Sequence, residues 1–340
     1  MNLQQRIDAM LALGKHLAQN EDAYLDAIMQ RTYHNNRWFT IENQQQAIQA
    51  IATQFLAPDA LTTWLSSYNI PEKNDPKNVG LIMAGNIPLV GFHDVLCVFL
   101  SGHRSIIKLS DKDQYLLPYL LKLLKQIDSA TEAYFTVVDK LKDFDAVIAT
   151  GSNNSARYFE AYFGKYPNII RKNRNGVVVL DGTETAEELQ ALGQDVFQYF
   201  GLGCRNISKL YVPEGYQFEA LLEALHEYKE IVLHSKYKNN FDYHYAIYII
   251  NRAKYLANGC IILQEKEAIA SPIANLHYEY YENTKQVSEK LKQHASEIQL
   301  VVSKTKLNEV NSIAFGQAQQ PALSDYADGV DTMAFLRDLS

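Results

Sequence analysis

Cys204 is the residue of this sequence best placed to act as a nucleophile. It lies in the stretch YFGLGCRNISKLYVPEG, residues 199–215, within a Gly-Leu-Gly turn that joins a helix-like segment to a strand-like one. Such a turn can expose the thiol, and the adjacent cation of Arg205 favours the reactive thiolate. Cysteine is also commonly buried and inert, and Cys97 and Cys260, inside apolar runs, fit that description. The local pattern leaves both interpretations of Cys204 open.

Polar residues also occur at two points where a strand-like run gives way to a helix-like one. In AVIATGSNNSARYF, Gly151 and Ser152 lie where a helix begins. Backbone amides there attract phosphate, although Ser152 is equally an ordinary N-cap. In VGLIMAGNIPLV, Asn86 follows a strand and is by itself an ordinary turn residue. No GxGxxG fingerprint follows the first strand, so these residues alone leave the ligand undetermined.

The elements that must position these residues follow from the hydrophobic pattern. Residues 1–68 have apolar side chains at helical spacing, and the polar, proline-containing stretch 71–78 ends that pattern. Short strand-like runs then alternate with helix-like ones, at 79–85, 105–109, 133–139 and 145–151. This alternation predicts a parallel sheet with helices on both faces, as in Rossmann-like nucleotide-binding domains.

A second α/β lobe is expected after about residue 180. The segment ETAEELQALGQDVFQYFG has the pattern of an amphipathic helix that ends at Gly201 and Gly203. Further strands are expected near 207–212, 246–250 and 259–263. A chain of 340 residues is long enough to form two such domains.

The composition limits the classes of function. A formal net charge of −7 argues against nucleic-acid binding, because neutralising phosphates needs a net basic surface. No apolar run reaches the roughly 18 residues needed to span a bilayer, and the first residues lack the features of a secretory signal. Together with three widely spaced cysteines, this predicts a cytoplasmic protein. The cysteines and histidines show no close metal-binding spacing, so no metal site is expected.

In combination, four stretches resemble a known family. MAGNIPLVG, SIIKLSD, IATGSNNS and YFGLGCRNISKLYVPEG occur in the order and approximate spacing of the aldehyde dehydrogenase superfamily, and they look like its LuxC-type branch, the fatty acyl-CoA reductases. The resemblance runs from about residue 76 to the C-terminus and includes SPIANLHYEYY and DYADGVDTM. It implies an aldehyde dehydrogenase-like α/β fold, with a Rossmann-like NAD(P)-binding domain over 76–180 and a catalytic domain carrying Cys204 over 181–310. A helical segment, 1–75, precedes these domains and a C-terminal segment, 311–340, follows them.

The resemblance assigns catalytic roles residue by residue. It makes Cys204 the nucleophile that accepts the acyl group, and Asn86 a donor that stabilises the oxyanion together with the Cys204 backbone N–H. Hydrolytic members of the superfamily carry a glutamate base upstream of the cysteine, at about the place where this chain has Ile170 and Arg171. Without that carboxylate, a thioester on Cys204 would persist rather than hydrolyse, which favours exchange with coenzyme A and reduction.

The resemblance also implies which residues bind the cofactor. Lys108, at the end of a strand, matches a lysine that contacts the adenosine ribose, and Asp111 lies where many relatives bind the ribose hydroxyls. Gly151 and Ser152 match the Gly-Ser pair at the pyrophosphate. Glu267 lies near the position of the superfamily glutamate that holds the nicotinamide ribose, although its spacing to Pro272 differs by one residue. An anion at Asp111 should repel the additional phosphate of NADPH, yet the LuxC branch is associated with NADPH. We expect NADPH, with NADH as the alternative.

Together these features predict an acyl-CoA reductase that converts an acyl thioester, a fatty acyl-CoA or another acyl donor, to the aldehyde through an acyl-Cys204 intermediate. The LuxC branch also implies an acyl-protein synthetase as a protein partner. Alternatives are an NAD(P)-dependent aldehyde dehydrogenase acting oxidatively, a non-catalytic relative with the same fold, and a cysteine hydrolase with His234 or His244 as base. The sequence leaves the acyl chain length and assembly into a homo-oligomer open.

Overall fold

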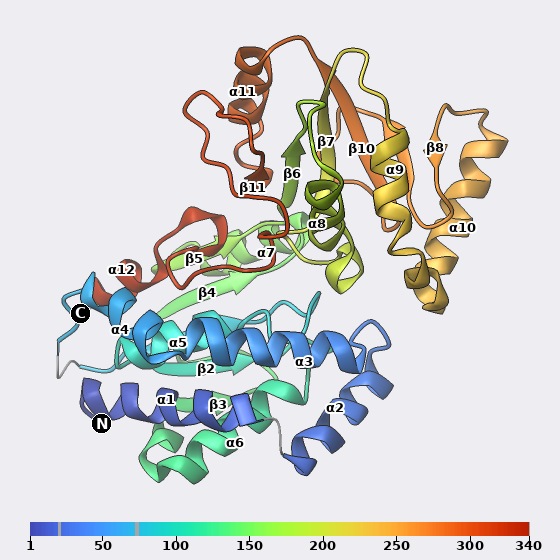
Figure 1. The fold of residues 1–340 in the computed structure, drawn as a ribbon. Helices are drawn as coiled ribbons and strands as arrows, with labels where there is room; N and C mark the ends of the chain where they lie inside the picture. Colours follow the sequence, from blue (N-terminus) through green and yellow to red (C-terminus); the bar gives the residue numbers. More distant parts are fainter. Residues whose placement is uncertain (20–21, 72–74, 340) are drawn as a thin grey trace. The chain divides into compact units, whose positions relative to one another are not determined.

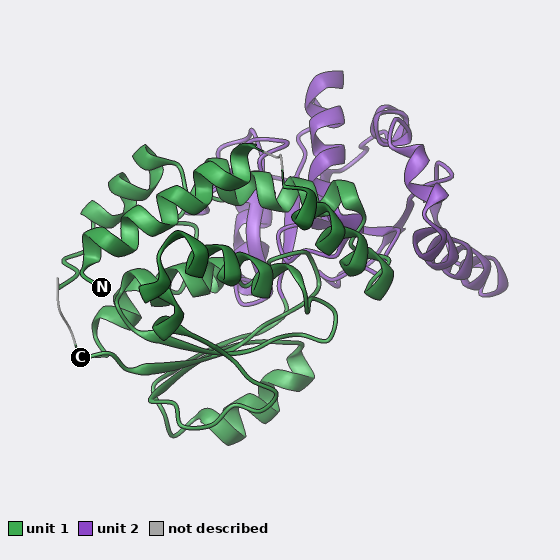
Figure 2. Ribbon diagram, turned by 90° about the horizontal axis from the view of Figure 1, so that it is seen from below, with its two compact units in different colours: residues 1–173, 321–340 green, residues 174–320 purple. Residues whose placement is uncertain are grey.

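The chain folds into two compact units. The computed structural model describes residues 1–19, 22–71 and 75–339. Unit 1 contains residues 1–173 and 321–340, and unit 2 contains residues 174–320 (Figure 2). The chain therefore leaves unit 1 once and returns to it at Pro321.

Unit 1 is built on a parallel sheet with the strand order β3-β2-β1-β4-β5 (Figure 1). Its strands are β1 (Asn78–Ile82), β2 (Arg104–Lys108), β3 (Phe135–Val137), β4 (Ala146–Thr150) and β5 (Asn168–Arg171). The central strands β1 and β4 are largely buried, as in strands that helices cover on both faces. The sheet confirms the α/β fold class that the alternating pattern predicts.

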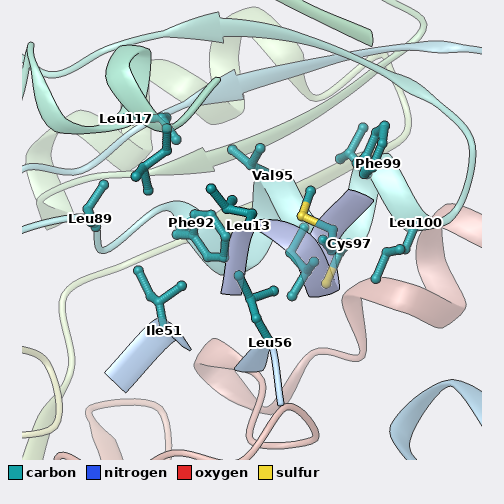
Figure 3. Packing of buried hydrophobic residues seen from close by; sticks show 14 of the residues in the cluster. Leu13, Ile51, Leu56, Leu89, Phe92, Val95, Cys97, Phe99, Leu100 and Leu117 are labelled. Carbon is teal, nitrogen blue, oxygen red and sulfur yellow. The ribbon is translucent and has the colours of Figure 1, made fainter. Parts of the chain in front are cut away.

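Unit 1 contains eight α-helices within the described residues, of which four precede the first strand and four follow it in the chain. They are α1 (Leu3–Gln19), α2 (Ala23–Asn35), α3 (Ile41–Ala50), α4 (Pro58–Ser66), α5 (Phe92–Leu100), α6 (Leu116–Ile127), α7 (Asn153–Phe163) and α12 (Thr332–Arg337). The first four form the helical segment expected over residues 1–68. Every residue of α5 except His93 is buried. Figure 3 shows Phe92 and Cys97 of this helix packed with Leu13 of α1 in the main apolar cluster, which stabilises unit 1.

Unit 2 contains a second sheet, with the strand order β11-β6-β7-β10-β9-β8. Its strands are β6 (Asn175–Val179), β7 (Ile207–Pro213), β8 (Leu256–Ala257), β9 (Ile262–Glu265), β10 (Asn275–Tyr281) and β11 (Ile298–Val302). Its helices are α8 (Ala186–Phe197), α9 (Glu219–His226), α10 (Ser235–Ile250) and α11 (Thr284–Gln293). The ladder is parallel from β11 to β9, and the short β8 is antiparallel to β9. This is the expected second α/β lobe.

The prediction of a strand near 246–250 is wrong, because this stretch forms the end of α10. Its sequence, AIYII, is rich in β-branched and aromatic residues, which are typical of strands. However, the buried residues Tyr237, Phe241 and Tyr248 recur at helical spacing. Tyr237 Oη donates to the Cys260 carbonyl at 2.8 Å, and Tyr248 Oη donates to Asn275 Oδ1 at 3.0 Å. Packing of this helical face overrides the local strand preference.

β6 belongs to the sheet of unit 2, where it pairs with β7 and β11. The expected boundary at residue 180 would leave this strand in the first domain, whereas unit 2 begins at Arg174 and ends at Gln320. A buried parallel strand has the same apolar pattern in either sheet, so its sequence does not show which sheet it joins.

Gly85 and Asp113 hold the loop after β1 against the turn after β2. A Cβ at Gly85 would lie 2.3 Å from Ser110 Oγ, so this close approach requires glycine. The buried Asp113 carboxylate accepts a hydrogen bond of 2.8 Å from the backbone N–H of Leu89, which has a left-handed φ of 56°. Burial raises the pKa of Asp113 to about 6, although the bond from Leu89 opposes the change.

The raised pKa of Asp113 predicts a pH-dependent loss of stability that asparagine removes. The folded protein binds this proton more tightly than the unfolded chain, whose aspartate pKa is about 4. The stability linked to Asp113 is therefore full below about pH 4 and is lost as the pH rises through about 6. Because Asp113→Asn keeps an acceptor for the Leu89 N–H, its gain in unfolding free energy over the wild type should be up to about 3 kcal/mol larger at pH 8 than at pH 4. Urea unfolding at both pH values measures this difference.

Asp113→Ala is the matched control, because it removes both the charge and the acceptor. We expect it to unfold more easily than Asp113→Asn at both pH values. A difference between wild type and Asp113→Asn that is the same at pH 4 and pH 8 would contradict the argument from burial.

Candidate active site

The turn that carries Cys204 follows a stretch of left-handed backbone. Tyr199, Phe200 and Gly201 have φ values of 54°, 59° and 73°. Glycine adopts this region readily, but each other residue there costs roughly 1 kcal/mol or more. Tyr199 is buried, and the ring centroid of Phe200 lies 4.4 Å from that of His234. Packing of these side chains therefore offsets the strain.

Asn206 fixes the turn itself. Its side chain is buried, and Oδ1 accepts a hydrogen bond of 2.8 Å from the Gly203 N–H. Nδ2 donates to the carbonyls of Asp195, at 3.0 Å, and Gln198, at 2.9 Å. The amide thus bonds the residue directly before Cys204 and the end of α8 at once. One buried side chain therefore sets where the thiol lies.

Asp195 and Arg205 connect this turn to residues 316–318. The Asp195 carboxylate accepts hydrogen bonds from the backbone N–H groups of Gly316, at 2.7 Å, and Ala318, at 2.8 Å. Burial raises the pKa of Asp195 to about 6, and these two bonds oppose that change. Arg205 Nε donates to the Ala318 carbonyl. The turn is therefore supported from a second, distant segment of unit 2.

Cys204 differs from the other cysteines in its surroundings. Cys97 and Cys260 are completely buried, and burial raises the pKa of the Cys97 thiol well above its usual range and that of Cys260 to about 11. Both thiols stay protonated and inert at neutral pH. Cys204 is not in a disulfide and is half-buried. Of the three cysteines, all within the described part of the chain, it is the one that is partly exposed.

A small hollow that is partly open to solvent lies next to the Cys204 turn within unit 2. Phe200 and Gly201 line one side, and Tyr237 of α10 lines another. The remaining wall includes residues 271–275, the end of the crossover from β9 to β10. The hollow is therefore bounded by the segment that leads into Cys204 and by the loop that carries Glu267.

The sheet of unit 1 brings the predicted residues of that unit to the carboxyl ends of its strands. Asn86 follows β1, Lys108 ends β2 with Asp111 in the next turn, and Gly151 and Ser152 follow β4. Because β2, β1 and β4 are adjacent and parallel, these loops lie together at their carboxyl ends. The strand order also reverses here: β2 and β3 are added on one side of β1, and β4 and β5 on the other. Open α/β sheets bind ligands at such a switch point, which here lies between β1 and β4.

Gly151 and Ser152 have structural roles at the start of α7. Ser152 is the N-cap, and its Oγ accepts a hydrogen bond of 3.2 Å from the Ser155 N–H. A Cβ at Gly151 would lie 2.8 Å from the Phe159 ring and 2.9 Å from Ser155 Cβ. The ordinary N-cap interpretation of Ser152 is therefore correct as far as it goes, and it is compatible with an anion at the amides of the same helix.

Glu267 lies in the crossover from β9 to β10, and its side chain is exposed. The crossover contacts β7, because Lys209 Nζ donates to the Lys266 carbonyl and Ser208 Oγ donates to the Ile269 carbonyl at 2.7 Å. Ser208 and Lys209 are four and five positions beyond Cys204. Glu267 is therefore carried by a loop that lies against the start of the strand that Cys204 precedes.

Arg171, near the place where hydrolytic relatives have a glutamate, is buried in unit 1. Its Nη1 lies 2.6 Å from Asp94 Oδ2, and its Nη2 donates to Thr332 Oγ1 at 2.9 Å. The ion pair and the nearby residues of the C-terminal segment hold the guanidinium in place. An arginine cannot act as a general base, because it stays protonated at any working pH.

Sequence reasoning does not identify Asn206, Asp195 or Asp113 as site residues. Asn206 carries a weak signal, because an asparagine after a glycine-containing turn commonly bonds nearby backbone groups. Asp195 and Asp113 carry none, since their partners lie far along the chain, at residues 316–318 and at Leu89.

Two kinds of feature are absent from residues 1–19, 22–71 and 75–339. Within these ranges, no group of three or more His, Cys, Asp or Glu side chains is arranged to hold a metal ion. The same ranges contain no helix of the length and apolar character needed to cross a membrane.

Solved structures share the fold at low identity. A putative aldehyde dehydrogenase from Burkholderia cenocepacia has 11% identity and a TM-score of 0.67, over 90% of this chain and 75% of that one. A glyceraldehyde-3-phosphate dehydrogenase from Methanocaldococcus jannaschii, complexed with NADP, has 13% identity and a TM-score of 0.64, over 92% and 77%. An aldehyde dehydrogenase from Mycobacterium tuberculosis, complexed with NAD+, has 14% identity and a TM-score of 0.59, over 85% and 71%. These similarities show that the chain has the aldehyde dehydrogenase fold.

The family is shown by the sequence itself. No curated protein matches the chain as a relative. The acyl-CoA reductase (LuxC) family, however, matches residues 6–257, well over half of the 340 residues. The resemblance expected from the four stretches is thereby confirmed. The chain belongs to the acyl-CoA reductase (LuxC) family and is an oxidoreductase that acts on acyl groups.

Proposed function

We propose that this protein reduces a fatty acyl-CoA to the aldehyde through an acyl group carried on Cys204. The observation that carries the proposal is the Cys204 turn, which Asn206 holds and which leaves this thiol half-buried while the other two are buried. The membership of the chain in the acyl-CoA reductase (LuxC) family supports the same proposal. A nucleophile that accepts the acyl group divides one difficult reduction into two easier steps.

The first step transfers the acyl group. The Cys204 thiolate forms a bond to the thioester carbonyl carbon, and the bond from that carbon to the coenzyme A sulfur breaks. Coenzyme A leaves as a thiol, with the proton that Cys204 has lost. The Cys204 backbone N–H and the Asn86 side chain are the proposed donors to the oxyanion, and one such donor lowers the barrier by roughly 3 to 4 kcal/mol.

The loop of Asn86 supports its role as a fixed donor. Asn86 is half-buried. On one side of it Gly85 lies close against Ser110, and on the other side the Asp113 carboxylate accepts a hydrogen bond from the Leu89 N–H, so the loop is held against the turn after β2. Fixed donors stabilise developing charge without reorganising during the reaction. A flexible loop would lose part of that advantage.

The second step reduces the acyl group. NAD(P)H, when bound, supplies a hydride to the acyl carbon. Cys204 would retain that carbon as a thiohemiacetal once the oxygen has taken up a proton from the solvent. The carbon–sulfur bond then breaks, the hydroxyl proton passes to the sulfur, and the aldehyde leaves.

The surroundings of Arg171 favour reduction over hydrolysis. No carboxylate base is available from Ile170 or Arg171, and the nearby Asp94 is paired with the guanidinium. A thioester on Cys204 would therefore await reduction instead of attack by an activated water. An aldehyde dehydrogenase acting oxidatively would need a base from elsewhere in the chain.

The carboxyl edge of the unit 1 sheet fits a dinucleotide cofactor, for which we propose NADPH with NADH as the alternative. Lys108 and Asp111 would bind the adenosine ribose, and the amides at Gly151 and Ser152 the pyrophosphate. Glu267, in unit 2, would bind the nicotinamide ribose. Solved structures of this fold are complexed with NAD+ or with NADP, which supports a nicotinamide cofactor here without deciding between the two.

The acyl donor is proposed to be an acyl-CoA or another acyl thioester. An acyl-protein synthetase that supplies activated fatty acid is the proposed protein partner, on the ground of the family alone. In either case, the acyl group would be transferred to Cys204.

The role of Cys204 is tested by following nicotinamide absorbance with short- to long-chain acyl-CoAs and NADPH or NADH in turn. The wild type should consume the reduced cofactor only when an acyl-CoA is present. Cys204→Ala should lower this rate by about a thousandfold or more, because it removes the atom that carries the acyl group. Cys97→Ala is the matched control and should keep a rate close to the wild type per folded molecule. A folded Cys204→Ala protein with near wild-type activity would refute the acyl-Cys204 route.

The role of Asp111 is tested by its effect on cofactor choice. Asp111 is exposed in the turn after β2. If its carboxylate faces the adenosine ribose, Asp111→Asn removes a like-charge contact with the NADPH phosphate. The ratio of kcat/KM for NADPH to that for NADH should then rise about tenfold.

Asp139→Asn provides the control for Asp111, because Asp139 is also exposed, beyond β3, and the change in net charge is the same. It should leave the cofactor ratio unchanged. Equal shifts in both variants would indicate a general charge effect and would remove Asp111 from the proposed cofactor site.

A further inference from the structure

Three side chains of the sheet form hydrogen bonds to backbone carbonyls of the crossover that carries Glu267. It runs over residues 266–274, which form neither helix nor strand. Lys209 Nζ donates to the Lys266 carbonyl, His277 Nδ1 donates to the Ala268 carbonyl at 2.8 Å, and Ser208 Oγ donates to the Ile269 carbonyl at 2.7 Å. Glu267 therefore lies between two residues whose carbonyls are bonded by side chains of β7 and β10.

Two of these donors, Lys209 and His277, form part of a buried polar row across the sheet. His277 of β10 is in register with Lys209 of β7 on one side and with Gln264 of β9 on the other. The three side chains are 3%, 0% and 7% exposed, respectively. His277 Nε2 and Gln264 Oε1 are buried without a hydrogen-bond partner. Buried polar atoms without a hydrogen-bond partner destabilise the folded state. A contribution to stability therefore does not explain why these polar side chains are buried side by side.

The ammonium group of Lys209 pairs with the carboxylate of Glu279. Its Nζ lies 2.9 Å from Glu279 Oε2, and Lys290 of α11 pairs with the other oxygen of the same carboxylate. Burial lowers the pKa of Lys209, whereas Glu279 opposes that change. A buried ion pair commonly adds little stability over apolar residues of the same volume. Lys209→Met would lose both the ion pair with Glu279 and the bond to the Lys266 carbonyl, and of these two the bond to the carbonyl is the one that reaches the crossover.

We propose that Lys209 is a positioning residue which, with Ser208 and His277, folds the crossover back along β7 so that Glu267 is presented near the Cys204 end of that strand. This rests on the proposed function, in which Glu267 binds the nicotinamide ribose. Lys209 thereby affects the hydride-transfer step and not the acyl-transfer step. The strand that begins after the Cys204 turn thus also sets the loop that serves the cofactor.

The two half-reactions separate this role from a general structural one. Coenzyme A released by the full-length protein without NAD(P)H reports acyl transfer, and single-turnover oxidation of NAD(P)H by the acylated protein reports hydride transfer. Lys209→Met should slow hydride transfer about tenfold to a hundredfold, because small displacements of a positioning group have effects of that size. It should change acyl transfer by no more than about twofold. An equal fall in both steps would overturn the proposal.

Three further variants sharpen the test. Lys209→Arg keeps a donor for the Lys266 carbonyl and should recover part of the hydride-transfer rate. Lys290→Met is the matched control: it takes a cation from Glu279 but no bond from the crossover, so both steps should stay within about twofold of the wild type. In the background of Glu267→Ala, Lys209→Met should cause no additional loss, since both act through one group. Additive losses would overturn the proposal.

Ser208→Ala covers the case in which Lys209→Met does not fold. It removes the bond to the Ile269 carbonyl and should lower hydride transfer alone, by a smaller factor than Lys209→Met. Unchanged hydride transfer in a folded Ser208→Ala protein would count against the three-point attachment.

Hydrogen exchange gives a readout that does not depend on activity. In Lys209→Met, the backbone amides of residues 266–274 should exchange faster than in the wild type, while those of residues 199–206 should not change. Equal exchange over 266–274 would overturn the proposal. A wild type that releases no coenzyme A would instead refute the proposed function and the hydride-transfer role with it, whereas the exchange result would still decide whether Lys209 holds the crossover.

Discussion

The geometry around the Cys204 thiol, the proposed nucleophile, depends on the buried side chain of Asn206. Its amide bonds the Gly203 N–H and two carbonyls at the end of α8, so the turn cannot relax without leaving buried polar groups unpaired. Each such group would cost about 1 to 3 kcal/mol. The left-handed residues 199–201 and the bonds of Asp195 to residues 316–318 are arranged around the same turn. A nucleophile gains from this support, because its position relative to the acyl carbon decides the rate.

Parallel strand pairing has the corresponding role in unit 1. The ladder β2-β1-β4 collects Asn86, Lys108 with Asp111, and Gly151 with Ser152 at one edge, although they are spread over much of the unit's sequence. Asp113 and Gly85 then fix the loop of Asn86, and Ser152 caps α7. In each unit, a buried polar side chain holds a loop with candidate chemistry in place. The arrangement suits acyl transfer to a thiol followed by reduction, and it offers no carboxylate at residues 170 and 171 for hydrolysis.

The sequence predicts the parts of this arrangement that depend on local pattern. The parallel α/β fold, the helical N-terminal segment and the Cys204 turn follow from short-range periodicity and glycine placement, and the family follows from four short stretches. The β-branched and aromatic residues at 246–250 locally favour a strand, whereas the packing of Tyr237, Phe241 and Tyr248 makes the segment helical. The supports of the site are also beyond local pattern. Asp113, Asp195 and Lys209 act on backbone groups tens of residues away, and their own sequence neighbourhoods are ordinary.

The measurement that tests the central claim most directly is the intact mass of the protein after incubation with a long-chain acyl-CoA in the absence of NAD(P)H. The acyl-Cys204 route predicts a mass increase of one acyl group per chain, release of an equal amount of coenzyme A, and loss of the adduct when NAD(P)H is then added. Peptide mapping should place the acyl group on Cys204, and Cys204→Ala should remain unmodified. An unmodified wild type that nevertheless reduces acyl-CoA, or an adduct that persists in Cys204→Ala, would contradict the claim.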